Sequence, residues 1–351
     1  MKIIKYSFFC KVTVMPVLFL FNILPCLNAQ AAPAWVSNLE RSYPSREWIA
    51  VTAQGSSQPQ AESAAMNSLA RAFKTDVTSI TQASQQFTQI VNNSESKRTI
   101  NFEESSNFLQ DVNFSANIKG LIGVQIDVYR DNRGTVHVCA RMNRSESAAR
   151  YSGMIRENTA IINTLLAAAA APGTFETYAR LSFAHALAQV TDNFQNILEV
   201  LDPASANRRP SYGGAASIKT KMIECASLIT IGIAVNTEQA ANKTLFTRAA
   251  GSFFRDHGFK TNEQGAGDYT LRANIRLEDI SQNVNSCRYY FDASLESRNG
   301  TSVFSFTEDD RKAHPNSQPE ARRLAAQAVE TSIKEAKFAN EFNSWLNSFI
   351  N

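Results

Sequence analysis

The middle of the chain carries two long stretches of helical periodicity, residues 145–171 and 174–201, separated by Pro172 and Gly173. Both separating residues interrupt helices, because proline lacks a backbone N–H group and glycine is conformationally permissive. The sequence therefore predicts an antiparallel helical hairpin over residues 146–202. The parts of the chain on either side of this hairpin are each long enough to fold as a domain.

Residues 33–145 alternate between strand and helix patterns. A strand is expected at 48–53, followed by a helix that begins with the capping-box sequence at 57–60. Two β-rich runs on either side of the turn sequence at 131–134 predict a β-hairpin. The polar stretch 78–112 has competing patterns, and we expect extended structure there.

Residues 218–351 repeat the same order of patterns, with strands expected at 228–235, 269–278, 289–295 and 301–307. The sequence therefore predicts an α+β fold of two modules, each of the order strand–helix–strand–strand–strand–helix, joined by the helical hairpin. Residues 203–217 are rich in proline, glycine and serine, and this composition predicts a linker before the second module.

The last predicted helix is long and amphipathic, and it becomes aromatic toward its end. Two interpretations are open. The aromatic face packs on the sheet of its own module, or it protrudes and docks on a partner protein or a membrane surface. The candidate partner-binding residues are Phe338, Phe342, Trp345, Leu346 and Phe349.

The N-terminus is typical of an export signal. Three lysines within the first eleven residues precede an uncharged, mostly apolar run at 12–24. This run has the length of a signal-peptide core and is too short to span a bilayer. Cleavage after Ala29 would make residues 1–29 a signal peptide. We therefore expect an exported protein of a bacterial cell envelope, periplasmic or associated with the outer membrane.

Cys26 gives the same signal a second interpretation. A lipoprotein signal would be cut before Cys26, which would then carry lipid and anchor the protein to a membrane. Pro25 is unfavourable at such a site. Cys26 is therefore a candidate lipidation site, and cleavage after Ala29 without lipid is the alternative.

The net charge and the spacing of the cysteines argue against nucleic-acid binding and against a cysteine-based metal site. Removing residues 1–29 takes away three lysines and no acidic residue, so the net charge of +3 disappears and nothing in the composition supports a nucleic-acid partner. Cys139, Cys225 and Cys287 do not have the spacing of a metal knuckle. Cys225 and Cys287 either form a disulfide, which export would permit, or are two separate buried thiols.

Small and apolar residues recur in a familiar pattern over residues 33–145, at 33–36, 48–56, 61–71, 118–129 and 135–144. This pattern resembles the LPP20 lipoprotein family, whose domain also begins the flagellar assembly protein FlgT. Thr52 and Gln54 depart from it, since glycine is more usual there. The resemblance implies an envelope protein with a structural or binding role, and it supplies no catalytic residues.

The sequence carries no motif for catalysis. It has no His-Glu-x-x-His helix, nucleophile elbow or phosphate loop. The acidic run at 308–310 is expected at a solvated strand end, with calcium binding as the alternative. The four histidines are far apart in the sequence: His137, His185, His257 and His314. We therefore expect no catalytic site, cofactor or metal.

Two functional hypotheses follow from these observations. The leading one is a non-enzymatic scaffold or assembly factor that binds other envelope proteins through sheet edges or the C-terminal aromatic helix. The alternative is a periplasmic ligand-binding module or enzyme whose site lies between the two modules.

Overall fold

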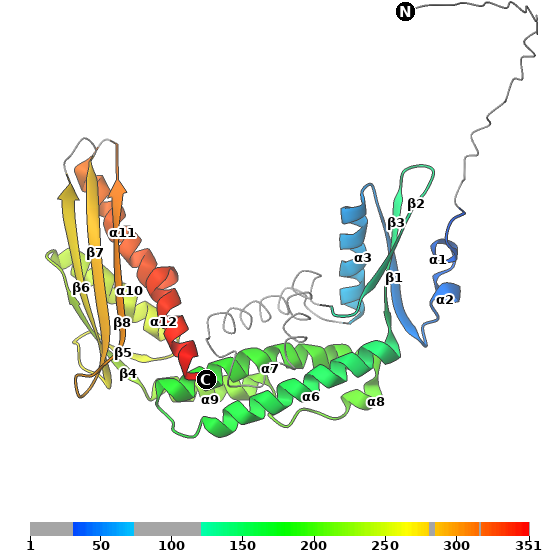
Figure 1. The fold of residues 1–351 in the computed structure, drawn as a ribbon, viewed down its shortest axis with the longest axis horizontal. Helices are drawn as coiled ribbons and strands as arrows, with labels where there is room; N and C mark the ends of the chain where they lie inside the picture. The colour runs from blue at the N-terminus through cyan, green and yellow to red at the C-terminus, as the bar shows by residue number, and fades with distance from the viewer. Residues whose placement is uncertain (1–30, 74–120, 281–284, 316, 351) are drawn as a thin grey trace, which may run out of the picture.

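The computed structural model of the chain describes residues 31–73, 121–280, 285–315 and 317–350. These residues form an α+β fold with one sheet at each end of a layer of long helices (Figure 1). The expected fold class is confirmed. The predicted signal peptide with Cys26, and the polar stretch 78–112, lie outside the described residues. No helix in the described ranges has the length and apolar character that a membrane span requires.

The first sheet has three antiparallel strands in the order β1–β3–β2. Alternation along β3 places Val136, Val138 and Ala140 on one face, where all three are buried in the core beneath α3. The hairpin predicted around 131–134 is confirmed as the β2–β3 connection. The elements of this module are α1 (Ala34–Ser37), α2 (Leu39–Ser42), β1 (Trp48–Gly55), α3 (Gln58–Ala72), β2 (Gln125–Arg130) and β3 (Val136–Asn143).

The helical hairpin is formed by α6 (Arg144–Ala168) and α7 (Phe175–Leu201). Gly173 lies between them with a φ of +76°, a conformation that glycine adopts without steric cost. The side chain of Thr174 then caps α7 by accepting a hydrogen bond from the Thr177 N–H. The predicted break and both long helices are therefore confirmed.

The segment at 203–217, predicted as a linker, is partly helical. It contains α8 (Pro203–Ala206) and the start of α9 (Ala215–Ser227), and both helices pack on α7. Asp192 of α7 fixes the segment between them, since its carboxylate accepts hydrogen bonds from the Tyr212 hydroxyl at 2.7 Å and from the Ala215 N–H at 2.8 Å. The glycine and proline residues thus belong to helix ends and tight turns.

The second sheet has five strands in the order β5–β4–β6–β7–β8. β4 runs parallel to β5 and β6, and the remaining pairs are antiparallel. The helices α10, α11 and α12 lie along one face of this sheet (Figure 1). The elements are β4 (Thr230–Asn236), α10 (Ala240–Asp256), β5 (Lys260–Asn262), β6 (Tyr269–Ile280), β7 (Ser286–Ser297), β8 (Ser302–Ala313), α11 (Gln318–Glu335), α12 (Lys337–Asn347) and the 3₁₀ turn η1 (Ser348–Ile350).

This module contains one strand more than expected, and its last helix is not continuous. The extra strand, β5, has only three residues, too few for an alternating pattern to be visible in the sequence. The C-terminal helix breaks at Ala336, whose φ and ψ of −117° and −128° are far from helical values. The expectation of one long C-terminal helix is therefore wrong.

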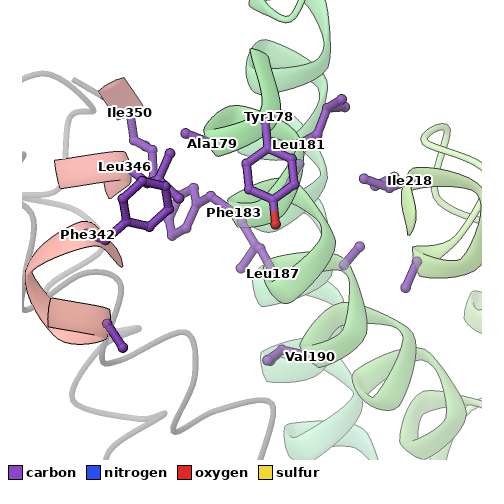
Figure 2. Close-up of a cluster of buried hydrophobic side chains, with 14 of the residues drawn as sticks. Tyr178, Ala179, Leu181, Phe183, Leu187, Val190, Ile218, Phe342, Leu346 and Ile350 are labelled. Atoms are coloured by element: carbon purple, nitrogen blue, oxygen red, sulfur yellow. The ribbon is translucent and has the colours of Figure 1, made fainter. Parts of the chain in front are cut away.

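The break directs the aromatic residues of α12 into the protein. Phe338, Phe342 and Leu346 are buried, while Trp345 and Phe349 are partly buried against the same core. Figure 2 shows Phe342, Leu346 and Ile350 meeting the α7 face that carries Ala179 and Phe183. The interpretation in which this face packs within the protein is confirmed, and the three buried residues are not available as contacts for a partner.

Candidate functional site

The strand β8 is an edge of the second sheet, because β7 is its only partner among the described strands. An edge strand presents unpaired N–H and C=O groups that another strand can join. Natural proteins commonly protect such edges with charged residues, and the second half of β8 has them at 308–312. The first half, residues 302–307, carries no charge.

A groove runs along this uncharged half, between β8 and α12. Its cavity has a volume of about 450 Å³ and is lined by Ser302, Val303, Phe304, Ser305, Glu341, Ser344 and Trp345. One wall is therefore formed by residues of β8 and the other by residues of α12. This combination of a free sheet edge beside a helix suits the addition of an extended segment.

A buried carboxylate holds α12 in position beside β8. Glu308 of β8 is 8% exposed and accepts hydrogen bonds from the Tyr289 hydroxyl at 2.8 Å and from the Ser332 hydroxyl of α11. The oxygen of Ser332 in turn accepts a hydrogen bond from the Phe338 N–H, at the start of α12. Burial, together with the Glu308 contact, raises the pKa of Tyr289 above its ordinary value. This network links β7, β8 and both C-terminal helices at the break.

A larger cavity of about 760 Å³ lies on the other side of α12, facing α7 and α9. Glu341 and Ser344 of α12 line both cavities. The structure brings His185 of α7 and His257 of α10 together in the lining of the larger cavity, although they are distant in sequence. Sequence reasoning did not find this combination, because it depends on how the hairpin packs on the second module.

Two hydrogen-bond contacts hold the ring of His257 in place, and burial shifts the pKa of His185. One ring nitrogen of His257 lies 2.9 Å from the Phe253 carbonyl oxygen and the other lies 3.0 Å from the Asn343 amide oxygen. Burial lowers the pKa of His185, and nearby Lys219 lowers it further, against an opposing effect of Asp192. The neutral form of the His185 ring is therefore favoured.

The residues singled out in the sequence are dispersed. Cys225 and Cys287 are both buried and free. They do not form the disulfide considered above, and the alternative of two separate buried thiols is confirmed. The physical reason is their placement: the Cys225 thiol on α9 faces the Thr174 carbonyl, whereas the Cys287 thiol on β7 lies beside the Arg288 carbonyl. The acidic run at 308–310 is also divided, since Asp309 pairs with Arg288 and Asp310 with Lys312.

A third cavity, of about 690 Å³, lies where β3 meets α6, beside α7 and α8. It joins the first module to the helical layer, just as the 760 Å³ cavity joins the second module to that layer. Neither of these two cavities is lined by residues of both sheets. They therefore do not correspond to a site between the two modules, where the alternative hypothesis expects one.

The first sheet also has an edge with apolar side chains. Ile126 and Val128 of β2 are 37% and 42% exposed. Residues 74–120, which lead into β2, lie outside the described part of the chain. The strand β8 has described residues on both its sheet side and its helix side, and it is the edge from which a function can be argued.

Comparison with known proteins gives only distant likenesses. No family model and no curated protein matches the chain. A minor lipoprotein from Acinetobacter baumannii shares 10% identity over 34% of this chain and 90% of its own, with a TM-score of 0.24. Protein XCC0632 from Xanthomonas campestris, of family DUF330, shares 16% identity over 33% of this chain and 81% of its own, with a TM-score of 0.25.

A third solved structure aligns over more of the chain. The secreted protein HP1454 from Helicobacter pylori shares 11% identity over 82% of this chain and 97% of its own, with a TM-score of 0.37. All three TM-scores are below 0.5. These likenesses therefore carry no argument about family or activity, and the function has to be argued from the chain itself.

Proposed function

We propose that this protein is a non-enzymatic binding protein of the bacterial cell envelope, and that it takes up an extended segment of another envelope protein along residues 302–305 of β8. The observation that carries the proposal is the uncharged edge of β8, which has no second partner among the described strands and lies beside the groove between β8 and α12. In an antiparallel pair, alternate residues direct their backbone groups away from the partner strand. β7 therefore leaves half of these groups on β8 for an added strand.

The groove adds side-chain recognition to this backbone pairing. An added strand would direct every second side chain toward the α12 wall, where Trp345 offers a partly exposed ring and Glu341 and Ser344 offer polar groups. Main-chain hydrogen bonds provide affinity in such complexes, and the pockets for alternate side chains provide specificity. Both components come from described residues of one module.

Export of the protein is part of the proposal. The basic and apolar residues 1–24 support a signal peptide, which would deliver the folded chain to the periplasm or the outer membrane. Cys26 would add a membrane anchor if it is lipidated. Mass spectrometry of the mature N-terminus distinguishes a chain that begins at Gln30 from one that begins at lipid-modified Cys26.

The alternative function is ligand binding or catalysis in the 760 Å³ cavity. Its volume falls within the usual range for small-molecule sites, and it contains two histidines and two carboxylates. The free strand edge next to it favours a polypeptide as the bound partner. A small molecule that binds with 1:1 stoichiometry and is displaced by no peptide would favour the alternative.

Site-specific cross-linking in intact cells tests the proposed function. We expect a photo-cross-linking amino acid in place of Ser305 on β8 to capture one envelope protein through a single extended segment. The same amino acid in place of Glu263, an exposed residue that follows β5 at the opposite edge of the sheet, serves as the control. Equal capture from both positions, or capture spread over many segments, would contradict the proposal.

A further inference from the structure

We infer that the segment bound at β8 presents a lysine or arginine side chain to Glu341 and lays its aliphatic part against Trp345. This inference rests on the proposed function, since it specifies the chemistry of the segment that the β8 edge accepts. It is drawn from the charges, the unpaired polar groups and the ring that line the groove.

The charge of the groove favours a cation. Glu341 lines both cavities and Asp256 lines the larger one, and no lysine or arginine of the described residues lines either cavity. Glu341 is exposed and forms no ion pair or hydrogen bond through its side chain with any described residue. Lys337, four residues earlier on α12, approaches Glu308 at 3.6 Å instead, and Lys334 pairs with Glu330 at 2.7 Å. A basic side chain would therefore find an unpaired carboxylate.

The uncharged polar groups of the groove point to the same chemistry. Tyr178 lines the larger cavity and is 4% exposed, and its hydroxyl forms no hydrogen bond with another described residue. Asn340 and Asn347 also line this cavity, and the side-chain amide of neither forms a hydrogen bond with another described residue. Lysine and arginine carry only donors, so oxygen atoms of these groups complement them.

Trp345 provides the surface for the aliphatic part of the side chain. Its ring is anchored on the core side by Phe175, at a centroid distance of 5.1 Å, and by Phe304, at 5.6 Å. It also lines the groove beside Glu341. Long basic side chains bury their methylene stems on apolar surface while the charged end stays at polar groups, and a cation near an indole face gains further stabilisation.

Direct binding of short peptides to the full mature chain tests this inference. The probe is a fluorescein-labelled peptide of alternating threonine and valine with one central lysine, and two matched peptides carry norleucine or glutamate at that position. We expect fluorescence anisotropy to give an affinity for the lysine peptide about 2–5-fold higher than for the norleucine peptide, as for an exposed ion pair. The glutamate peptide should bind most weakly.

Three variants assign the effect to Glu341. We expect Glu341→Gln to remove the difference between the lysine and norleucine peptides, and Glu341→Lys to make the glutamate peptide the tightest of the three. Glu335→Gln is the matched control, because Glu335 is an exposed carboxylate at the end of α11 that lines neither cavity. Its peptide preferences should equal those of the unchanged chain. Circular dichroism confirms that each variant is folded.

The outcomes separate this inference from the proposed function. Equal affinities for the three peptides, unchanged by Glu341→Lys, would overturn the inference and leave strand addition at β8 standing. Failure of every peptide to bind would contradict the proposed function itself. If the free chain is a dimer in sedimentation and Ser305 cross-links to Ser305 of the second copy, a second copy occupies the edge and the inference is wrong.

Discussion

Replacing Phe342 by alanine is expected to lower the free energy of unfolding by about 3–5 kcal/mol, the usual cost of truncating a buried aromatic side chain. Phe342 is 0% exposed. Its ring centroid lies 6.2 Å from that of Phe175 on α7, 5.4 Å from that of Phe253 on α10 and 5.6 Å from that of Phe304 on β8. One side chain therefore joins the hairpin, the sheet and α12.

Urea-induced unfolding followed by circular dichroism measures this change. Phe349→Ala is the matched control, because Phe349 lies near the end of the same aromatic run but is only partly buried. The control should lose clearly less stability than Phe342→Ala. A similar, small loss in both variants would mean that α12 does not pack on the hairpin, and the groove would then lack its helical wall.

Replacing Glu308 by alanine is expected to destabilise the second module by about 1–3 kcal/mol for each donor that loses its acceptor. The two donors are the hydroxyls of Tyr289 and Ser332. Lys337 also approaches Glu308, at 3.6 Å, although its side chain is largely exposed and adds little. The loss should therefore come mainly from the two buried hydroxyls.

Urea unfolding and peptide binding together test this role of Glu308. Asp309→Asn provides the control, because Asp309 is the next residue on β8 and pairs with Arg288 at the surface. It should change the free energy of unfolding much less than Glu308→Ala. We also expect Glu308→Ala to weaken peptide binding at β8, since α12 is then no longer fixed at Ala336. Unchanged stability and binding would show that the buried network does not hold the groove.

Local sequence signals were sufficient for much of the fold. The break at Pro172 and Gly173, the hairpin turn at 131–134 and the alternation along β6 each depend on residues close together in the chain. Glycine and proline occur at helix ends as well as in irregular chain, so the composition of residues 203–217 does not reveal the helices at its two ends. This segment is held by Asp192 of α7, 20 residues before Tyr212, which accepts hydrogen bonds from the Tyr212 hydroxyl and the Ala215 N–H.

The groove could not be predicted from the sequence. It depends on the order of the strands in the sheet and on the hydrogen-bond network of Glu308, whose members are far apart in the sequence. The sequence of residues 302–307 does not indicate that β8 lies at the edge of the sheet. Its edge position is seen only in the strand order, where β8 is last and is paired with β7. The helix break at Ala336 is not marked by a proline or glycine in the sequence. It lies next to the hydrogen bond between the Ser332 hydroxyl and Glu308. The aromatic run was correctly identified as unusual, yet its burial depends on that break.

The most direct test of strand addition at β8 uses the lysine peptide with methyl groups on its backbone nitrogens, placed either at the odd or at the even positions. Only alternate residues of an added strand donate hydrogen bonds to the edge. Strand addition therefore predicts that methylation at one set of alternate positions abolishes binding. The peptide methylated at the other set should bind like the unmodified peptide. Equal affinities for the two methylated peptides would contradict strand addition.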